Sequence, residues 1–119
     1  MKPGFSVIIP THNRLNLLKI SLESVIKQKF IPGEILISDN LCQKEVKDYV
    51  DLVNNQTKIN IIYIGHKKGG RGAISRNLAA QKSSYNYLAF LDDDDLWDEN
   101  YLSEAYNLIK KNNINFLYT

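Results

Sequence analysis

The hydrophobic positions of this chain follow two kinds of spacing, which alternate along the sequence. Short apolar runs rich in β-branched residues are typical of strands that are buried on both faces. Between these runs, apolar residues recur every three or four positions, as they do on one face of a helix. The pattern predicts strands at 5–10, 34–38, 59–64, 85–91 and 114–119.

The predicted helices lie between these strands. The first begins near Asn13, and the others cover 43–54, 73–82 and a segment after Asp98, which is the expected N-cap of the last helix. Two helices carry clear apolar stripes, which are Leu15, Leu18, Leu22, Val25 and Ile26 in the first and Leu102, Ala105, Leu108 and Ile109 in the last.

Alternating strands and helices predict an α/β fold with a mostly parallel sheet, right-handed crossovers and helices on both faces, in three layers. Residues 1–119 are expected to form a single domain. No element follows the last predicted strand, so we expect the domain to be incomplete at its C-terminal end. An edge strand there offers unpaired backbone groups for self-association or for a partner chain.

The composition argues against several classes of protein. The formal net charge is only +2, which does not favour a nucleic-acid partner. The sequence shows no signal peptide and no apolar run near the ~20 residues that span a bilayer. The single cysteine, Cys42, excludes an intramolecular disulfide and is typical of a reducing compartment. These features predict a cytoplasmic protein, either free or peripheral at the inner face of a membrane.

Unusual polar residues occur where the predicted strands end. Thr11 follows the first strand, Asp39 the second, the glycine-rich segment 65–72 the third and Asp92–Asp95 the fourth. In parallel α/β sheets, ligands bind in the crevice outside the carboxyl ends of the strands. The sequence therefore predicts a single site at this edge of the sheet.

The four consecutive carboxylates Asp92–Asp95 indicate a metal site. Adjacent charges repel one another by roughly 1 kcal/mol per close pair in water, and hard cations such as Mg2+ and Mn2+ prefer carboxylate oxygens. A solvated acidic loop is the alternative. An EF-hand is excluded because Trp97 occupies the sixth position, where that loop requires glycine.

The segment 65–72 has the ingredients of an anion site, because it combines glycines with Lys67, Lys68 and Arg71 and precedes a predicted helix. Arg76, one turn into that helix, presents a fork of donors to a diphosphate. The segment lacks the Gly-Lys-Ser/Thr ending of a P-loop, so a surface loop is the alternative.

Thr11 and Asp39 are candidates for hydrogen bonds to a nucleobase or ribose. Each has a structural alternative, since Thr11 suits a strand-end turn and Asp39 suits the cap of the next helix. Arg76 likewise suits an ion pair on the surface. Taken together, the strand ends indicate a site for a metal-bound nucleoside diphosphate.

Five segments resemble the inverting family 2 glycosyltransferases, which have the GT-A fold of the nucleotide-diphospho-sugar transferases. One of them, 22–25 with Gln28, is similar to the family's first helix. Segment 5–14 is similar to the family's opening strand, which usually ends Pro-Thr-Tyr-Asn-Arg, and 34–39 to its aspartate-ended strand. Segments 72–77 and 90–95 resemble the family's Ala-Arg-Asn helix and Asp-X-Asp segment. The resemblance covers nearly the whole chain, in the family's order.

The resemblance implies nucleotide-binding roles for five residues. Thr11 and Asp39 would contact the nucleoside, and Arg76 would contact the base or the diphosphate. Asp92 would approach the ribose, and Asp93 would fill the variable middle position beside the nucleotide.

The resemblance also implies a metal and a sugar contact. Asp94, together with Asp92, would hold Mn2+ or Mg2+ against the diphosphate, and Asp95 would contact the donor sugar. One departure concerns the turn after Asp39, where Asn40-Leu41-Cys42 stands in place of the family's usual Asp-Gly-Ser.

The implied reaction transfers a sugar from a nucleotide sugar, expected to be a UDP-sugar, to a hydroxyl of a saccharide or lipid-linked acceptor with inversion. The general base is expected beyond Thr119, so no catalytic residue is assigned and the chain alone is expected to be weakly active or inactive. A non-catalytic binding module or half of a split enzyme is the alternative. A sugar-nucleotide pyrophosphorylase is disfavoured because 11–14 is not a glycine-rich basic loop.

Overall fold

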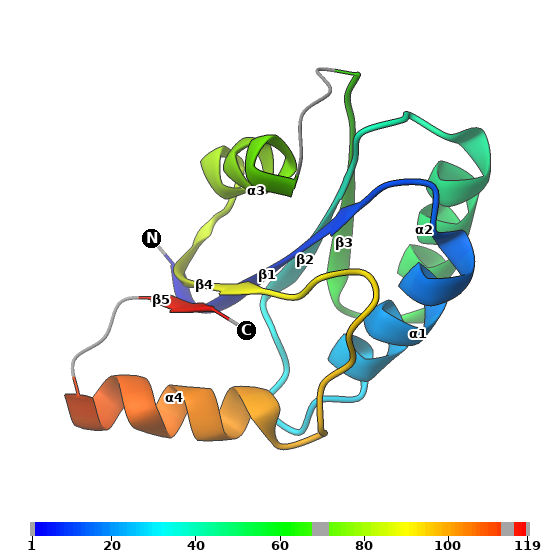
Figure 1. Cartoon of the computed structure of the whole chain (residues 1–119). Coiled ribbons are helices and arrows are strands. Elements are labelled where there is room, and N and C mark those ends of the chain that lie inside the picture. Colours follow the sequence, from blue (N-terminus) through cyan, green and yellow to red (C-terminus); the bar gives the residue numbers. More distant parts are fainter. Residues whose placement is uncertain (1, 68–71, 113–115, 119) are drawn as a thin grey trace.

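The computed structural model describes residues 2–67, 72–112 and 116–118, and within them it contains five strands and four helices (Figure 1). The strands are β1 (Lys2–Thr11), β2 (Glu34–Asp39), β3 (Asn60–Gly65), β4 (Tyr85–Phe90) and β5 (Phe116–Tyr118). The helices are α1 (Leu15–Ile26), α2 (Lys44–Gln56), α3 (Gly72–Gln81) and α4 (Tyr101–Asn112). The predicted alternation of strands and helices is confirmed.

The strands form one sheet in the order β3-β2-β1-β4-β5, and every described pairing is parallel. The pairing aligns Thr11 at the end of β1 with Asp39 at the end of β2. Leu91, directly after β4, continues this alignment by donating its backbone N–H to Ile8 of β1. The first residues after β1, β2 and β4 therefore meet at one edge of the sheet.

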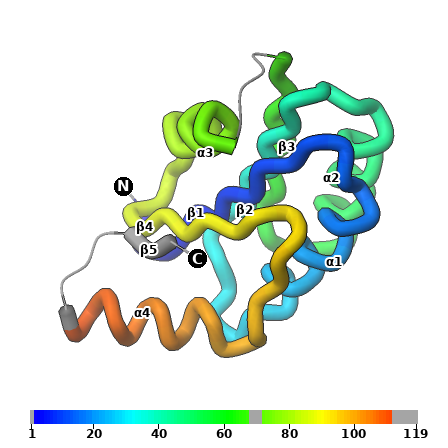
Figure 2. Tube along the Cα trace, viewed as in Figure 1, coloured from blue at the N-terminus to red at the C-terminus, as the bar shows by residue number. Residues whose placement is uncertain are grey.

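The helices cover the two faces unequally, as the trace in Figure 2 shows, with α3 on one face and α1, α2 and α4 on the other. The larger core lies on the face of α1, α2 and α4 and contains Phe5, Val7 and Ile9 of β1. The smaller core joins Ile8 of β1 to Ala79 of α3. Alternate residues of β1 thus enter opposite cores, which explains its continuous apolar run.

Two details of the last helix differ from the sequence prediction. Leu108 is 50% exposed, whereas its stripe neighbours Leu102, Ala105 and Ile109 are buried. The helix α4 begins at Tyr101 rather than directly after Asp98, whose carboxylate accepts the backbone N–H of Asn100 at 2.7 Å in the turn before the helix. A short polar side chain binds its own backbone two residues on as readily as it caps a helix.

The side chain of Gln28 connects the end of α1 to the start of α4 by two hydrogen bonds. Gln28, just after α1, donates to the carbonyl of Asp98 at 2.6 Å and accepts the backbone N–H of Leu102 at 2.9 Å. Ser24 of α1 accepts the backbone N–H of Trp97 at 3.1 Å. These bonds hold the downstream end of the segment that carries the acidic turn. Among the described residues, no helix is long and apolar enough to cross a membrane.

Candidate functional site

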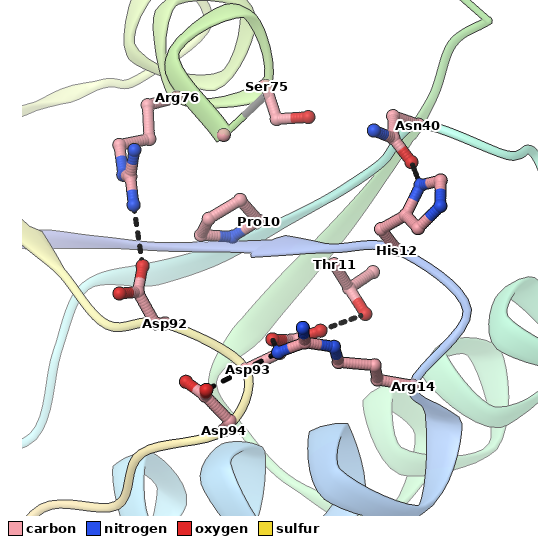
Figure 3. A pocket seen from close by; sticks show the side chains of 11 residues that line it. Pro10, Thr11, His12, Arg14, Asn40, Ser75, Arg76, Asp92, Asp93 and Asp94 are labelled. Atoms are coloured by element: carbon pink, nitrogen blue, oxygen red, sulfur yellow. Dashed lines mark hydrogen bonds and ion pairs between the residues drawn. The ribbon is translucent and has the colours of Figure 1, made fainter. Parts of the chain in front are cut away.

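A cavity of about 220 Å3 lies at the carboxyl ends of β1, β2 and β4. Its walls come from segments far apart in the sequence, which are the turn after β1, Asn40 after β2, the first turn of α3 and the acidic turn after β4 (Figure 3). The predicted convergence is therefore seen for the ends of β1, β2 and β4, and of the described residues in the segment 65–72 only Gly72 lines the cavity.

The acidic turn points its carboxylates in two directions. Asp95 donates its backbone N–H to the carbonyl of Asp92 at 3.1 Å, which closes the turn. One carboxylate oxygen from each of Asp92, Asp94 and Asp95 then lies within 4.8 Å of the others. Asp93 is buried instead. The turn thus separates one buried carboxylate from three clustered ones that are more exposed.

Asp93 connects the acidic turn to the end of β1. Thr11 donates its hydroxyl to Asp93 Oδ2 at 2.9 Å, and Arg14 Nη1 lies 3.4 Å from Asp93 Oδ1. Burial raises the pKa of Asp93, while the hydrogen bond from Thr11 and the charge of Arg14 oppose that rise. Figure 3 shows Asp93 between these two partners.

Each of the other two carboxylates in the cavity wall is paired with an arginine. Arg76 of α3 donates to Asp92 Oδ1 at 2.6 Å, and Arg14 Nη1 lies 3.3 Å from Asp94 Oδ2. The arginines come from opposite sides of the cavity, as Figure 3 shows. The cavity wall therefore carries two ion-paired clusters, Arg76 with Asp92 and Arg14 with Asp93 and Asp94, whose carboxylates suit a cation and whose guanidinium groups suit an anion.

Asp39 is enclosed by the protein. It is fully buried, and its carboxylate accepts hydrogen bonds from the backbone N–H groups of Leu41 at 3.0 Å and Gln43 at 2.8 Å, and from the Tyr63 hydroxyl at 2.8 Å. Burial and the bond to Asp39 raise the pKa of Tyr63. These contacts close the turn before α2, whose N-cap is Gln43, so Asp39 acts in the turn rather than as the predicted helix cap. Its contact with a nucleoside stays a prediction.

The turn after Asp39 is closed although it contains no glycine. The two backbone bonds to the Asp39 carboxylate span it, and Cys42 adopts a positive φ of 52°. Cys42 itself is exposed. The departure at positions 40–42 thus leaves a closed turn that presents Asn40 to the cavity.

Four polar residues that the sequence analysis did not assign line the cavity, and they are His12, Arg14, Asn40 and Ser75. The Nδ1 atom of His12 contacts Oδ1 of Asn40, which joins the turns after β1 and β2. Ser75 bonds His66 behind the cavity wall at 2.8 Å. The sequence signal that could have identified these residues is their position, which is just after a predicted strand or about one turn into the predicted helix at 73–82.

The basic loop is only partly described. Residues 68–71 lie outside the described residues, so the predicted anion-binding role of Lys68 and Arg71 has no structural account here. Lys67 is exposed. Beyond this loop, Gly72 begins α3 and lines the cavity together with Arg76, which places the start of the helix beside the acidic turn.

Comparison with known proteins gives consistent matches. A family model described as "Glycosyl transferase family 2" matches residues 6–118. The chain is 34% identical over 113 residues to UDP-Glc:alpha-D-GlcNAc-diphosphoundecaprenol beta-1,3-glucosyltransferase WfgD of Escherichia coli, covering 95% of the chain and 44% of WfgD. It is 27% identical to the putative teichuronic acid biosynthesis glycosyltransferase TuaG of Bacillus subtilis, covering 99% of the chain and 46% of TuaG. The chain thus spans less than half the length of these relatives.

Solved structures have the same arrangement of elements. TarS of S. aureus in complex with UDP-GlcNAc superposes with a TM-score of 0.76 and 28% identity, over 95% of this chain and 32% of the TarS chain. The mannosyltransferase PcManGT of Pyrobaculum calidifontis, in complex with GDP-Man and Mn2+, gives a TM-score of 0.80 at 19% identity, over 92% of this chain and 33% of PcManGT. The second likeness concerns the fold alone.

Proposed function

The chain belongs to glycosyl transferase family 2, whose model matches residues 6–118, and from this membership we propose that it forms the nucleotide-sugar-binding half of a glycosyltransferase. The GT-A fold predicted for it is confirmed by the solved relatives. The observation that carries the proposal is the cavity in which clustered carboxylates and two arginines meet at the carboxyl edge of the sheet.

The carboxylates fit a hard divalent cation. Asp92, Asp94 and Asp95 supply three oxygen ligands within 4.8 Å of one another, and Mg2+ and Mn2+ prefer oxygen ligands. We assign Asp92 and Asp94 as the metal-holding pair and place Asp95 beside them, toward the donor sugar. Such a cation, when bound, neutralises charge that develops on the departing diphosphate.

The arginines fit the diphosphate. Arg76 lies one turn into α3, close to the helix start whose N–H groups also favour an anion, and its planar fork matches phosphate oxygens. We propose a UDP-sugar as the donor because WfgD is named as a UDP-Glc enzyme and TarS binds UDP-GlcNAc. Arg76 and Asp92 then exchange their mutual ion pair for ligand contacts.

The nucleoside is proposed to lie toward the ends of β1 and β2. Asn40 and His12 line that part of the cavity, and an amide has both a donor and an acceptor for the edge of a base. Thr11 and Asp93 support this wall from below through their buried hydrogen bond. Asp39 supports it indirectly, because its carboxylate fixes the turn that carries Asn40.

The proposed reaction is inverting transfer of the sugar to a hydroxyl of a saccharide or lipid-linked acceptor. The described residues act by binding and orienting the donor, and the general base is proposed to lie outside residues 1–119. Association through β5, which lies at one edge of the sheet, and a cytoplasmic location both stay predictions. A non-catalytic nucleotide-sugar-binding module remains the second candidate, since the cavity accounts only for donor binding.

Calorimetry with UDP, GDP, ADP and CDP in the presence of Mn2+ tests the proposal. UDP is expected to bind most tightly, and Arg76→Ala is expected to weaken it by about tenfold or more, as for loss of a charged hydrogen bond. Lys82→Ala, an exposed cation just after α3, is the control and should leave the affinity unchanged. Failure of every nucleotide to bind would contradict the proposal. Hydrolysis of a UDP-sugar, measured with and without a candidate second half of the enzyme, distinguishes an enzyme from a binding module.

A further inference from the structure

Arg14 forms an ion pair with Asp94, one of the two carboxylates assigned to the cation. Its Nη1 atom lies 3.3 Å from Asp94 Oδ2 and 3.4 Å from Asp93 Oδ1, so that one guanidinium bridges two neighbours in the acidic turn. Asp94 also belongs to the group whose oxygens lie within 4.8 Å of one another. A cation held by that group therefore meets a positive charge that is already in place.

The two positive charges oppose each other. An arginine keeps its charge at all ordinary pH values, so it cannot yield by losing a proton. A single positive charge about 5 Å from a divalent ion weakens the binding of that ion by roughly tenfold even in surroundings as polar as water. Arg14 must move away from Asp94 before the carboxylate is fully available to a metal.

The structure shows why Arg14 is able to move. The side chains of Arg14 and Asp94 are 50% and 52% exposed, and exposed ion pairs are weak. Asp93 keeps its buried hydrogen bond from Thr11 when Arg14 leaves. Arg76 is more firmly held, since its side chain is 21% exposed and lies 2.6 Å from Asp92.

We propose that Arg14 couples cation binding to nucleotide binding, by pairing with Asp94 in the free protein and with the diphosphate in the complex. This inference rests on the proposed function, because it requires a phosphate-bearing ligand in the cavity that Arg14 lines. The diphosphate gives the displaced guanidinium new acceptors, and the vacated carboxylate gives the cation a new ligand. By linkage, each ligand then raises the affinity of the other by the same factor.

Binding of Mn2+ alone, followed by the electron paramagnetic resonance signal of the free ion, tests the first half of the inference. Arg14→Gln is expected to bind Mn2+ about tenfold more tightly than the wild-type chain, because the competing charge is gone. Arg14→Lys keeps the charge and should bind Mn2+ as the wild type does. Lys47→Gln removes a cation from an exposed pair with Asp51 on α2 and should change nothing.

The outcomes of this comparison are decisive without any nucleotide. Equal or weaker Mn2+ binding by Arg14→Gln, or no Mn2+ binding by either protein, overturns the inference. Thermal unfolding of each variant shows that the comparison is made between folded proteins.

The second arm repeats the titration with saturating UDP. UDP is expected to raise the Mn2+ affinity of the wild-type chain at least threefold more than that of Arg14→Gln, since only the wild type has an arginine to transfer. The same increase in both proteins overturns the coupling. Absence of UDP binding to the wild type instead contradicts the proposed function, and the measurement with Mn2+ alone still decides whether Arg14 opposes the cation.

Discussion

Thr11 and Asp93 join the end of β1 to the acidic turn through a buried hydrogen bond of 2.9 Å. Asp93 is the buried member of the four-carboxylate run, and it lines the cavity together with its more exposed neighbours Asp92 and Asp94. This single bond therefore links the central strand of the sheet to the geometry of the proposed metal site.

Replacing Thr11 by valine removes the donor and leaves a buried carboxylate with a poorer set of partners. We expect Thr11→Val to lower the free energy of unfolding by about 2 kcal/mol, the usual effect of losing a hydrogen bond to a charged group. Urea denaturation at neutral pH measures this change. Thr11→Ser keeps the hydroxyl and should cost clearly less, so equal losses in both variants would show that the bond to Asp93 is not the cause.

Tyr63→Phe tests the buried position of Asp39. Removing the hydroxyl that donates to Asp39 is expected to cost about 1 to 2 kcal/mol of stability at neutral pH. The folded chain raises the pKa of Tyr63 above its ordinary value of 10.0, so the folded state retains this proton longer than the unfolded state does. The stability that the tyrosine contributes is therefore complete below about pH 10 and declines as the pH rises further.

Unfolding curves of the wild type and Tyr63→Phe, measured between neutral pH and about pH 11, test the direction in which this stability changes with pH. The advantage of the wild type should shrink toward the alkaline end. An advantage that stays constant or grows would contradict the assignment of Tyr63 as a neutral donor to Asp39.

Gln28→Met tests whether the hydrogen bonds between α1 and α4 stabilise the fold. The substitution keeps the length of the side chain and leaves the carbonyl of Asp98 and the N–H of Leu102 without their partner. We expect a loss of about 2 to 4 kcal/mol, measured by urea denaturation. Gln56→Met at the exposed end of α2 is the matched control, and an equally small effect at both positions would contradict this account.

Gly33→Ala tests packing at the opposite end of the sheet. A Cβ atom at Gly33 would lie 2.1 Å from Cζ of Tyr85, so the ring has to move. We expect a loss of about 1 to 3 kcal/mol, typical of overpacking. In a Tyr85→Ala background the same substitution should cost less than about 0.5 kcal/mol, and purely additive effects would sink the explanation. Nucleotide affinity should not change.

The sequence predicts the fold well because strand and helix periodicities are local properties. The run 5–10 is apolar at nearly every position because β1 lies at the centre of the sheet and faces a core on each side. Leu108 was predicted to be buried but is exposed. An apolar stripe indicates which side of a helix is buried, but not how wide the buried surface is. The neighbours of α4 decide which of its apolar residues are covered.

The site is less predictable because the direction of a side chain depends on the turn that follows a strand. The sequence indicates both Asp39 and Asp93 by their position, yet the structure buries both carboxylates, and it is Asn40 rather than Asp39 that lines the cavity. The sequence analysis does not predict the role of Arg14 in the site for the same reason. It stands at the start of α1, and only the tertiary structure brings it against the acidic turn.

The dependence of UDP binding on a divalent cation tests the central claim most directly. Titration calorimetry of UDP into the chain is to be compared in Mn2+, in EDTA, and in Mn2+ with Asp94→Asn, with the exposed Asp51→Asn as the control. The account predicts that UDP binds in Mn2+ and that both EDTA and Asp94→Asn weaken binding by about tenfold or more, as for loss of a metal ligand. The same affinity for UDP with and without Mn2+ would contradict the account.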